Sequence, residues 1–194
     1  MDEKKNRKKK KQKEQAQPEQ QALRESYDWI QSLISALLIC VLVFVFVLRV
    51  MDVNGESMEP TLHNGNKILV SGLFYEPKRG DIVVFKKDSY DEGKALVKRV
   101  IAVAGDSVNI DFENGIVYVN GEALEEDYIK ELTTMKIDFM GPLLVPENCV
   151  FVLGDNRNSS RDSRDKRIGV VDKRLIVGKV LLVLYPFDSF GSVD

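Results

Sequence analysis

The chain has one histidine and two cysteines among its 194 residues, and this scarcity excludes several kinds of catalytic site. A histidine-based triad would have to use His63, which stands in a turn-like Leu-His-Asn-Gly run where we expect a surface turn. No Cys and His residues have the spacing of a zinc site, and no glycine-rich phosphate-binding loop is present in the sequence. We therefore expect neither a metal nor a cofactor.

The two cysteines stand in different surroundings and are not expected to form a disulfide. Cys40 falls within a long apolar run, and Cys149 opens the apolar stretch Cys149–Leu153. A cysteine nucleophile needs a basic neighbour that lowers the pKa of its thiol, and the surroundings of Cys149 are apolar. We expect Cys149 to be buried packing.

Positive charge is concentrated at the N-terminus, although the whole chain is nearly balanced with 28 basic and 30 acidic residues. No aromatic residue is interleaved with the lysines of residues 4–13, so a platform that stacks nucleic-acid bases is not expected. Basic residues ahead of an apolar span mark the cytoplasmic side of a membrane. We predict that residues 1–28 form a disordered, basic cytoplasmic tail and that the chain binds no nucleic acid.

A transmembrane anchor helix is predicted over residues 29–49. No charged side chain occurs from Trp29 to Leu48, and a helix of this length spans about 30 Å, close to one hydrocarbon core. The alternative, a cleavable signal peptide, would have a shorter apolar region followed by small residues, whereas Arg49-Val50-Met51-Asp52 follows here. We therefore expect a single-pass protein of the cell membrane that contacts lipid through residues 29–49. Its N-terminus would be cytoplasmic and residues 50–194 extracytoplasmic.

The fold class predicted for residues 50–194 is mostly β, an antiparallel β-sheet or barrel-like domain after the N-terminal transmembrane helix. Short runs rich in Ile and Val alternate with glycine-containing turns. Asn114-Gly115 and Asn120-Gly121 separate strand-like runs, which is typical of β-hairpins. Residues 122–147 are polar without clear alternation, and we expect an insertion or long excursion between core strands there.

Ser57 and Lys98 form the candidate catalytic pair. Ser57 stands between a glycine and a proline in Gly55–Leu62, which fits a loop that presents a hydroxyl and its own backbone N–H, and equally fits an ordinary turn. Lys98 lies in the apolar stretch Leu96–Ile101, where it either reaches solvent from an edge strand or is buried. A free lysine has a pKa of about 10.4 and is neutral in roughly one molecule in 2,500 at pH 7, and burial lowers that pKa by several units. A buried Lys98 could therefore act as the base for Ser57 if the fold brings the two together.

A third polar segment, Gly154–Arg164, follows an apolar strand-like run. It is dense in hydroxyl, carboxylate and guanidinium groups. It is either a surface turn or a buried polar network around a site. The apolar runs on both sides favour the network.

Four motifs in this order, behind a single predicted anchor, resemble the bacterial type I signal peptidases. The matching stretches are Gly55–Leu62, Arg79–Phe85, Val97–Ile101 with Gly105-Asp106, and Gly154–Arg164. The short chain and the single anchor are similar to the Gram-positive form. The resemblance implies a serine endopeptidase that removes N-terminal signal peptides from exported preproteins, with residues 50–194 as its catalytic domain.

The resemblance also implies roles for individual residues. Ser57 would be the nucleophile and Lys98 the general base, while Ser160 would hydrogen-bond the lysine amine and orient it. The backbone N–H of Ser57 would bind the oxyanion, and Gly55 stands where several family members have a serine that supplies a second donor. The source of that second donor is left open here. The implied supporting network consists of Asp155, Arg157, Asp162 and Arg164.

By the same resemblance, the partners of the chain are signal peptides, cleaved after small residues. An extended peptide would add as a strand flanked by Met51–Glu56 and Leu96–Lys98. Shallow apolar pockets without room for larger side chains would be lined by Met58, Leu62, Leu96 and Val97. The sequence makes no prediction of the oligomeric state.

Two other classes of protein fit parts of this sequence. A catalytically silent, membrane-tethered β-domain that binds export substrates would keep the fold but would not need both Ser57 and Lys98. A self-cleaving Ser-Lys regulator would carry a DNA-binding helical domain where this chain has a lysine-rich tail and an apolar run.

Overall fold

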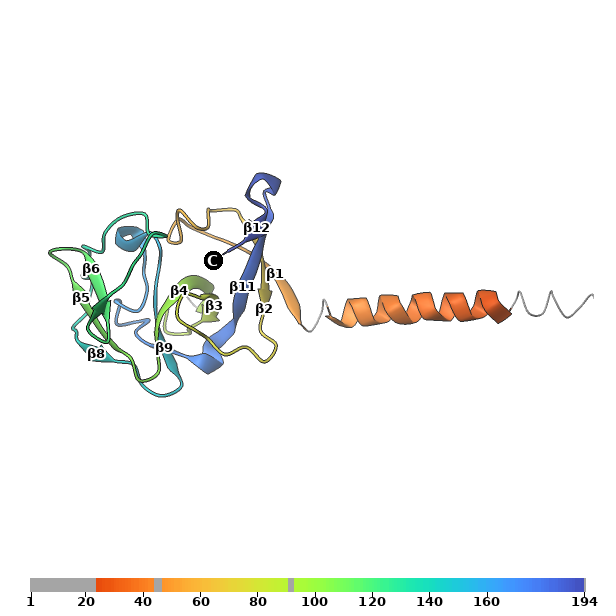
Figure 1. Cartoon of the computed structure of the whole chain (residues 1–194), viewed down its shortest axis with the longest axis horizontal. Coiled ribbons are helices and arrows are strands. Elements are labelled where there is room, and N and C mark those ends of the chain that lie inside the picture. The colour runs from red at the N-terminus through yellow and green to blue at the C-terminus, as the bar shows by residue number, and fades with distance from the viewer. Residues whose placement is uncertain (1–23, 44–46, 91–92, 194) are drawn as a thin grey trace, which may run out of the picture. The chain divides into compact units, whose positions relative to one another are not determined.

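The computed structural model describes residues 24–43, 47–90 and 93–193 (Figure 1). The chain divides into two units, Met1–Phe46 and Val47–Asp194. The predicted tail therefore lies mostly outside the described residues, and only its last few positions can be compared with the structure.

The first unit contains a helix over Arg24–Val43 that is long and apolar enough to cross a membrane. Its apolar side chains are exposed on all sides, for example Leu33 at 70% and Ile39 at 61%. A helix that is apolar all round suits a lipid environment. Residues 24–28, which we expected to be disordered, are helical, because the helix formers of this stretch extend the apolar helix toward the N-terminus.

The expected end of the anchor at residue 49 also differs from the structure. Leu48 and Arg49 open strand β1 (Leu48–Asp52), where they pair with Ser71 and Val70 of β2 (Lys67–Ser71). An apolar composition alone does not distinguish a helix from a strand. The available backbone partner in β2 decides the conformation here.

The second unit is built on two antiparallel sheets (Figure 1). The larger has eight strands in the order β1-β2-β11-β3-β4-β9-β10, with β12 added on β11. Besides β1 and β2 its strands are β3 (Ile82–Lys86), β4 (Ala95–Val103), β9 (Cys149–Leu153), β10 (Val171–Asp172), β11 (Ile176–Tyr185) and β12 (Gly191–Ser192). The prediction of a mostly β, antiparallel domain is confirmed.

The smaller sheet has four strands in the order β7-β6-β5-β8. They are β5 (Ser107–Asp111), β6 (Ile116–Val119), β7 (Glu122–Ala123) and β8 (Leu143–Leu144). Both Asn-Gly pairs connect antiparallel strands as predicted, and Asn120 and Gly121 have φ angles of 55° and 84°, the left-handed conformation that a tight hairpin requires. Residues 124–142, all described, contain neither helix nor strand, so the long excursion leaves the small sheet at β7 and returns at β8.

The centre of the large sheet is buried on both faces. In β3, Ile82 and Val84 belong to one core cluster and Val83 and Phe85 to another, and all four are at most 1% exposed. Strand β9 divides its side chains between two clusters in the same way. A strand placed between β3 and β9 is therefore shielded from water.

Short 3-10 helices complete the unit at Arg157–Ser159 (η2), Lys173–Leu175 (η3) and Phe187–Ser189 (η4). Both cysteines are free. Cys149 is half-buried and not fully buried as predicted, because it begins β9 at the margin of a core cluster and not in its interior.

Candidate active site

Strand order settles the position of Lys98. It lies on β4, which the sheet places between β3 and β9, so the alternative of a solvent-reaching lysine on an edge strand is excluded. Lys98 pairs with Val83 of β3 and is 2% exposed. The apolar sequence around Lys98 therefore corresponds to a strand in which the lysine side chain itself is buried.

Ser57 lies in the turn that follows β1. Gly55, with φ of +94°, gives this turn a backbone conformation that side chains disfavour, and its N–H donates to Asn64 Oδ1 at 2.9 Å. On the other side of the serine, Met58 and Leu62 are buried in a core cluster at 1% and 0% exposure. The turn is thus held at both ends, and Ser57 lines a small cavity that residues of β1 and β4 also line.

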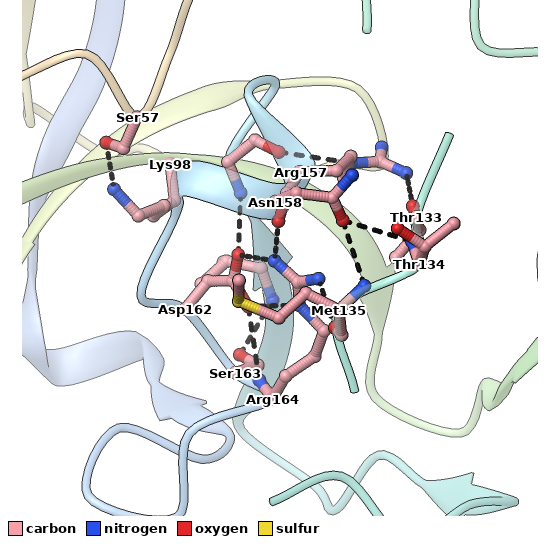
Figure 2. Close-up of polar contacts among 12 residues, drawn as sticks. Ser57, Lys98, Thr133, Thr134, Met135, Arg157, Asn158, Asp162, Ser163 and Arg164 are labelled. Atoms are coloured by element: carbon pink, nitrogen blue, oxygen red, sulfur yellow. Dashed lines mark hydrogen bonds and ion pairs between the residues drawn. The ribbon is translucent and has the colours of Figure 1, made fainter. Parts of the chain in front are cut away.

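The two predicted catalytic groups meet across the fold. Lys98 Nζ lies 2.7 Å from Ser57 Oγ, and it also donates to the Val97 carbonyl at 2.7 Å (Figure 2). Burial lowers the pKa of Lys98 to about 8, against the opposing effect of the Asp162 and Asp155 carboxylates. A lysine with that pKa is neutral in roughly one molecule in ten at pH 7, compared with one in thousands for a free lysine.

The Gly154–Arg164 segment forms a buried polar network and not a surface turn. Arg164 pairs with Asp162 through Nε and Nη2, both at 2.8 Å, and both side chains are fully buried. Figure 2 shows this pair beside Arg157 and close to Lys98. The Gly154 N–H donates to Asp162 Oδ2 at 3.1 Å, so the same carboxylate also fixes the chain where it leaves β9.

Asp155 joins β4 to the turn that carries Ser57. Arg99, the neighbour of Lys98, donates to both carboxylate oxygens of Asp155 at 3.0 and 2.8 Å. Thr61 Oγ1 donates to the same carboxylate at 2.6 Å. Arg99 and Asp155 are 2% and 0% exposed, so the charges are compensated inside the protein.

Ser160 does not make the hydrogen bond to Lys98 that the resemblance implies. Its Oγ is buried and has no hydrogen-bond partner among the described residues. The Ser160 side chain lies against Gly154. A Cβ added at Gly154 would come within 2.2 Å of Ser160 Oγ and 2.6 Å of Ser160 Cβ, which is closer than van der Waals contact allows. The amine of Lys98 is instead bonded to Ser57 and the Val97 carbonyl.

A cavity of about 50 Å³ opens beside the pair. Its lining includes Met58, Leu96 and Val97, together with Ser57 and Lys98. Leu62, which we expected in an apolar pocket, is not part of the lining, because the backbone bond from Leu62 N–H to the Met58 carbonyl turns it into the core.

Sequence reasoning did not assign Arg99, Glu126 or Tyr128 to the network. Glu126 pairs with Arg157 at 2.6 Å, and the Tyr128 ring lies 4.1 Å from the Arg99 guanidinium. Arg99 could have been predicted from the sequence to form a buried ion pair, because a second cation beside Lys98 in an apolar run requires a counter-ion. No sequence pattern indicated Glu126 or Tyr128, because both belong to the irregular excursion between β7 and β8.

His63 does not line the cavity beside Ser57 and Lys98. His63 is 56% exposed and its Nδ1 lies 3.7 Å from the Glu59 carboxylate, which confirms the predicted surface turn. Across the described residues, no group of three or more His, Cys, Asp or Glu side chains is arranged to hold a metal ion. A serine hydroxyl next to a buried lysine on antiparallel sheets is the arrangement of a Ser-Lys hydrolase.

Comparison with known proteins identifies the family. The family described as "Signal peptidase, peptidase S26" matches residues 26–185. A signal peptidase I of Bacillus licheniformis is 35% identical over 179 residues, covering 87% of this chain and 93% of its own. A signal peptidase I P of Bacillus subtilis subsp. natto is 38% identical over 172 residues, covering 83% and 90%. A crystal structure of a signal peptidase I from Enterococcus faecalis V583 covers 54% of this chain and 97% of its own, at 33% identity and a TM-score of 0.45.

The chain belongs to the signal peptidase family, peptidase S26. The resemblance inferred from four short motifs is thereby confirmed over most of the length of the chain.

Proposed function

We propose that this protein is a membrane-anchored serine endopeptidase that cleaves N-terminal signal peptides from exported preproteins, with Ser57 as nucleophile and Lys98 as general base. The observation that carries the proposal is the 2.7 Å separation of Ser57 Oγ and the Nζ of a lysine that is 2% exposed. A lysine can accept a proton only when it is neutral, and burial supplies that condition. Membership of the signal peptidase family supports the reaction and the substrate class.

The chemistry follows from the two groups. The neutral amine of Lys98 takes the hydroxyl proton of Ser57 while Oγ attacks the scissile carbonyl carbon, forming a tetrahedral oxyanion. When the oxyanion collapses, the C–N bond breaks, and the Lys98 ammonium gives its proton to the leaving amine. Water then attacks the acyl-enzyme, with Lys98 again accepting a proton, and the Ser57 hydroxyl is restored.

The oxyanion needs donors that are fixed before the reaction. The backbone N–H of Ser57 is one, since the turn that carries it is held by Gly55 on one side and by Met58 on the other. Such a donor contributes about 3 kcal/mol to catalysis. The N–H of Gly55 is bonded to Asn64 Oδ1, so a second donor would come from another group.

The substrate binds as an extended strand beside the catalytic pair. Met51–Asn54 and Ala95–Lys98 line the cavity from two sides, so an extended peptide that enters it would run between these two segments. Met58, Leu96 and Val97 form the apolar lining. A cavity of about 50 Å³ favours small side chains next to the bond that is cut, which is the basis of the proposed specificity.

The helix Arg24–Val43 anchors the protein in the membrane as a single pass. The lysine-rich residues before it favour a cytoplasmic N-terminus, with residues 50–194 outside. Tethering raises the effective concentration of the site for substrates that emerge at the bilayer. Register shifts within β4 and β11 bend these strands, which supports a barrel-like curl of the large sheet.

Cleavage of a preprotein by the detergent-solubilised protein tests this function. The parent should release the signal peptide, and Ser57→Ala and Lys98→Ala should each lose several orders of magnitude in rate, because members of one catalytic unit fail together. Ser192→Ala and Lys173→Ala, which change residues that do not line the cavity, serve as matched controls. Binding of the preprotein without cleavage by the parent would instead identify a tethered binding domain, and full activity of Lys98→Ala would refute the assignment of the base.

A further inference from the structure

Residues 126–130 contact both parts of the candidate active site, although none of them lines its cavity. We call them the 126–130 strap. They belong to the excursion between β7 and β8, and their contacts fall at every second residue, on Glu126, Tyr128 and Lys130. Each of the three contacts reaches a different part of the structure that holds Ser57 and Lys98.

Glu126 holds the segment that follows β9. Its carboxylate accepts two hydrogen bonds from Arg157, at 2.9 and 2.6 Å, and the two side chains are 6% and 0% exposed. Arg157 in turn donates from Nε to the Gly154 carbonyl at 3.1 Å. A bidentate pair of this kind fixes orientation as well as position.

Tyr128 holds the lysine strand. Its ring lies 4.1 Å from Arg99 Cζ, and its hydroxyl donates to Glu126 Oε1 at 3.1 Å. The face of an aromatic ring attracts a guanidinium cation, most strongly where water is excluded. Arg99 follows Lys98 in β4 and forms the buried pair with Asp155.

Lys130 holds the serine turn. Its backbone N–H donates to the Asp155 carbonyl at 3.0 Å, and its Nζ donates to Glu59 Oε2 at 2.8 Å. Glu59 stands two residues after Ser57 in the same turn. The strap therefore connects the lysine strand, the segment after β9 and the serine turn.

We propose that the 126–130 strap positions Ser57 against Lys98, with Tyr128 and Lys130 as positioning residues. The proposal rests on the function proposed above. Displacement of a reacting atom by about 1 Å can cost on the order of a hundredfold in rate, so contacts that fix two chain segments relative to each other affect catalysis without touching substrate. The charges that act on Lys98 belong to Asp162, Asp155 and Arg164, and none of them is on the strap.

Lys130→Met and Tyr128→Leu test the proposal in preprotein cleavage by the full-length, detergent-solubilised protein. Lys130→Met breaks an exposed ion pair, and such pairs contribute little to folding stability, so this variant should fold like the parent. Lys173→Met, which breaks the exposed pair with Glu76 at 2.9 Å, is the matched control. Tyr128→Phe keeps the ring over Arg99, and the exchange Glu59→Lys with Lys130→Glu rebuilds the ion pair with its charges reversed.

We expect kcat to fall about three- to tenfold in Lys130→Met and Tyr128→Leu. This factor corresponds to the free energy of one exposed ion pair or one cation–π contact. KM and the pH at which the rate is half-maximal should not change. Tyr128→Phe and the charge exchange should recover most of the lost kcat. Lys173→Met should behave as the parent.

Two results would overturn the proposal. One is a kcat equal to that of the parent in both Lys130→Met and Tyr128→Leu. The other is a loss of activity that simply follows loss of thermal stability across all variants, since this would indicate a purely structural role. Failure of the proposed function is a separate result, because then either the parent itself would not cleave the preprotein or Ser57→Ala would cleave it as well as the parent.

Discussion

The backbone N–H of Asn156 donates to the carbonyl of Ser57 at 3.1 Å, and the Asn156 side-chain amide donates to the carbonyl of Glu56 at 3.0 Å. These two bonds join the segment after β9 to the serine turn, about a hundred residues away in sequence. The serine turn is therefore positioned by contacts from outside itself. Lys98 approaches from a third segment, β4, and the pair exists only in the complete fold.

Gly154→Ala should disrupt this junction. A Cβ at position 154 would collide with the carbonyl oxygen of Ser57 and with Ser160 Oγ. Overpacking of this kind costs typically about 1–3 kcal/mol of stability and shifts the backbone, so we expect a lower melting temperature and a loss of about a hundredfold in cleavage rate. Thermal unfolding and preprotein cleavage measure the two effects.

Gly191→Ala is the matched control, because an added Cβ there meets no atom within 4 Å. It should leave both stability and cleavage close to those of the parent. If Gly154→Ala cleaves as fast as Gly191→Ala, the serine turn does not depend on its contact with Gly154.

Asp155→Leu should be strongly destabilising. It removes the counter-ion of Arg99, which is 2% exposed, and breaking a buried ion pair by removing one partner costs about 3–5 kcal/mol. The double variant Arg99→Met with Asp155→Leu should be more stable than Asp155→Leu alone, because no unpaired charge is left in the core. Thermal unfolding followed by circular dichroism compares the stability of the single and the double variant. A double variant that is less stable than Asp155→Leu would contradict this account of the buried network.

Lys98→Met should be inactive but more stable than the parent at pH 7. Burial lowers the pKa of Lys98 to about 8, and in the unfolded chain the pKa returns to about 10.4. Between these values the unfolded state holds a proton that the folded state has released, so the stability of the parent rises with pH in that window. Below pH 8 the full cost of burying the ammonium is present, and the variant should gain about 3 kcal/mol there.

The gain of Lys98→Met over the parent should shrink as pH rises from 8 toward 10. Lys173→Met, at a position where the lysine side chain is 28% exposed and pairs with Glu76, is the control for the substitution itself. A difference in stability that is independent of pH from 7 to 10 would show that the cost of Lys98 does not come from burial of its charge.

The sequence carried enough information to predict a mostly β, antiparallel domain and to single out Ser57 and Lys98 as candidates, which the structure places 2.7 Å apart. Val–Ile-rich runs and Asn-Gly turns predicted antiparallel strands, because both signals are local. Lys98 was singled out as a lysine among apolar residues, whereas the segment around Ser57 fits an ordinary turn equally well, and the roles of both came from the resemblance to the family. The burial of Lys98 was left open, because it depends on the order β3-β4-β9, which is a property of the whole sheet.

The supporting contacts were harder to predict, for physical reasons. The partner of Arg157 is Glu126, in a segment without helix or strand, and no periodic pattern connects the two. The bond expected from Ser160 to Lys98 is not made in the part of the chain that the structure describes, where the Ser160 side chain lies against Gly154. The start of β1 at Leu48 was missed because β2 supplies the backbone partner from a distance in sequence.

The pH dependence of kcat/KM, measured with a signal-peptide substrate from pH 6 to 10, tests the central claim most directly. Since kcat/KM reports ionisations of the free enzyme, it should rise about tenfold per pH unit below pH 8 and level off above it, as Lys98 loses its proton. A profile that is flat across this range, or one that is still rising at pH 10, would contradict the assignment of a buried, neutral Lys98 as the base that activates Ser57.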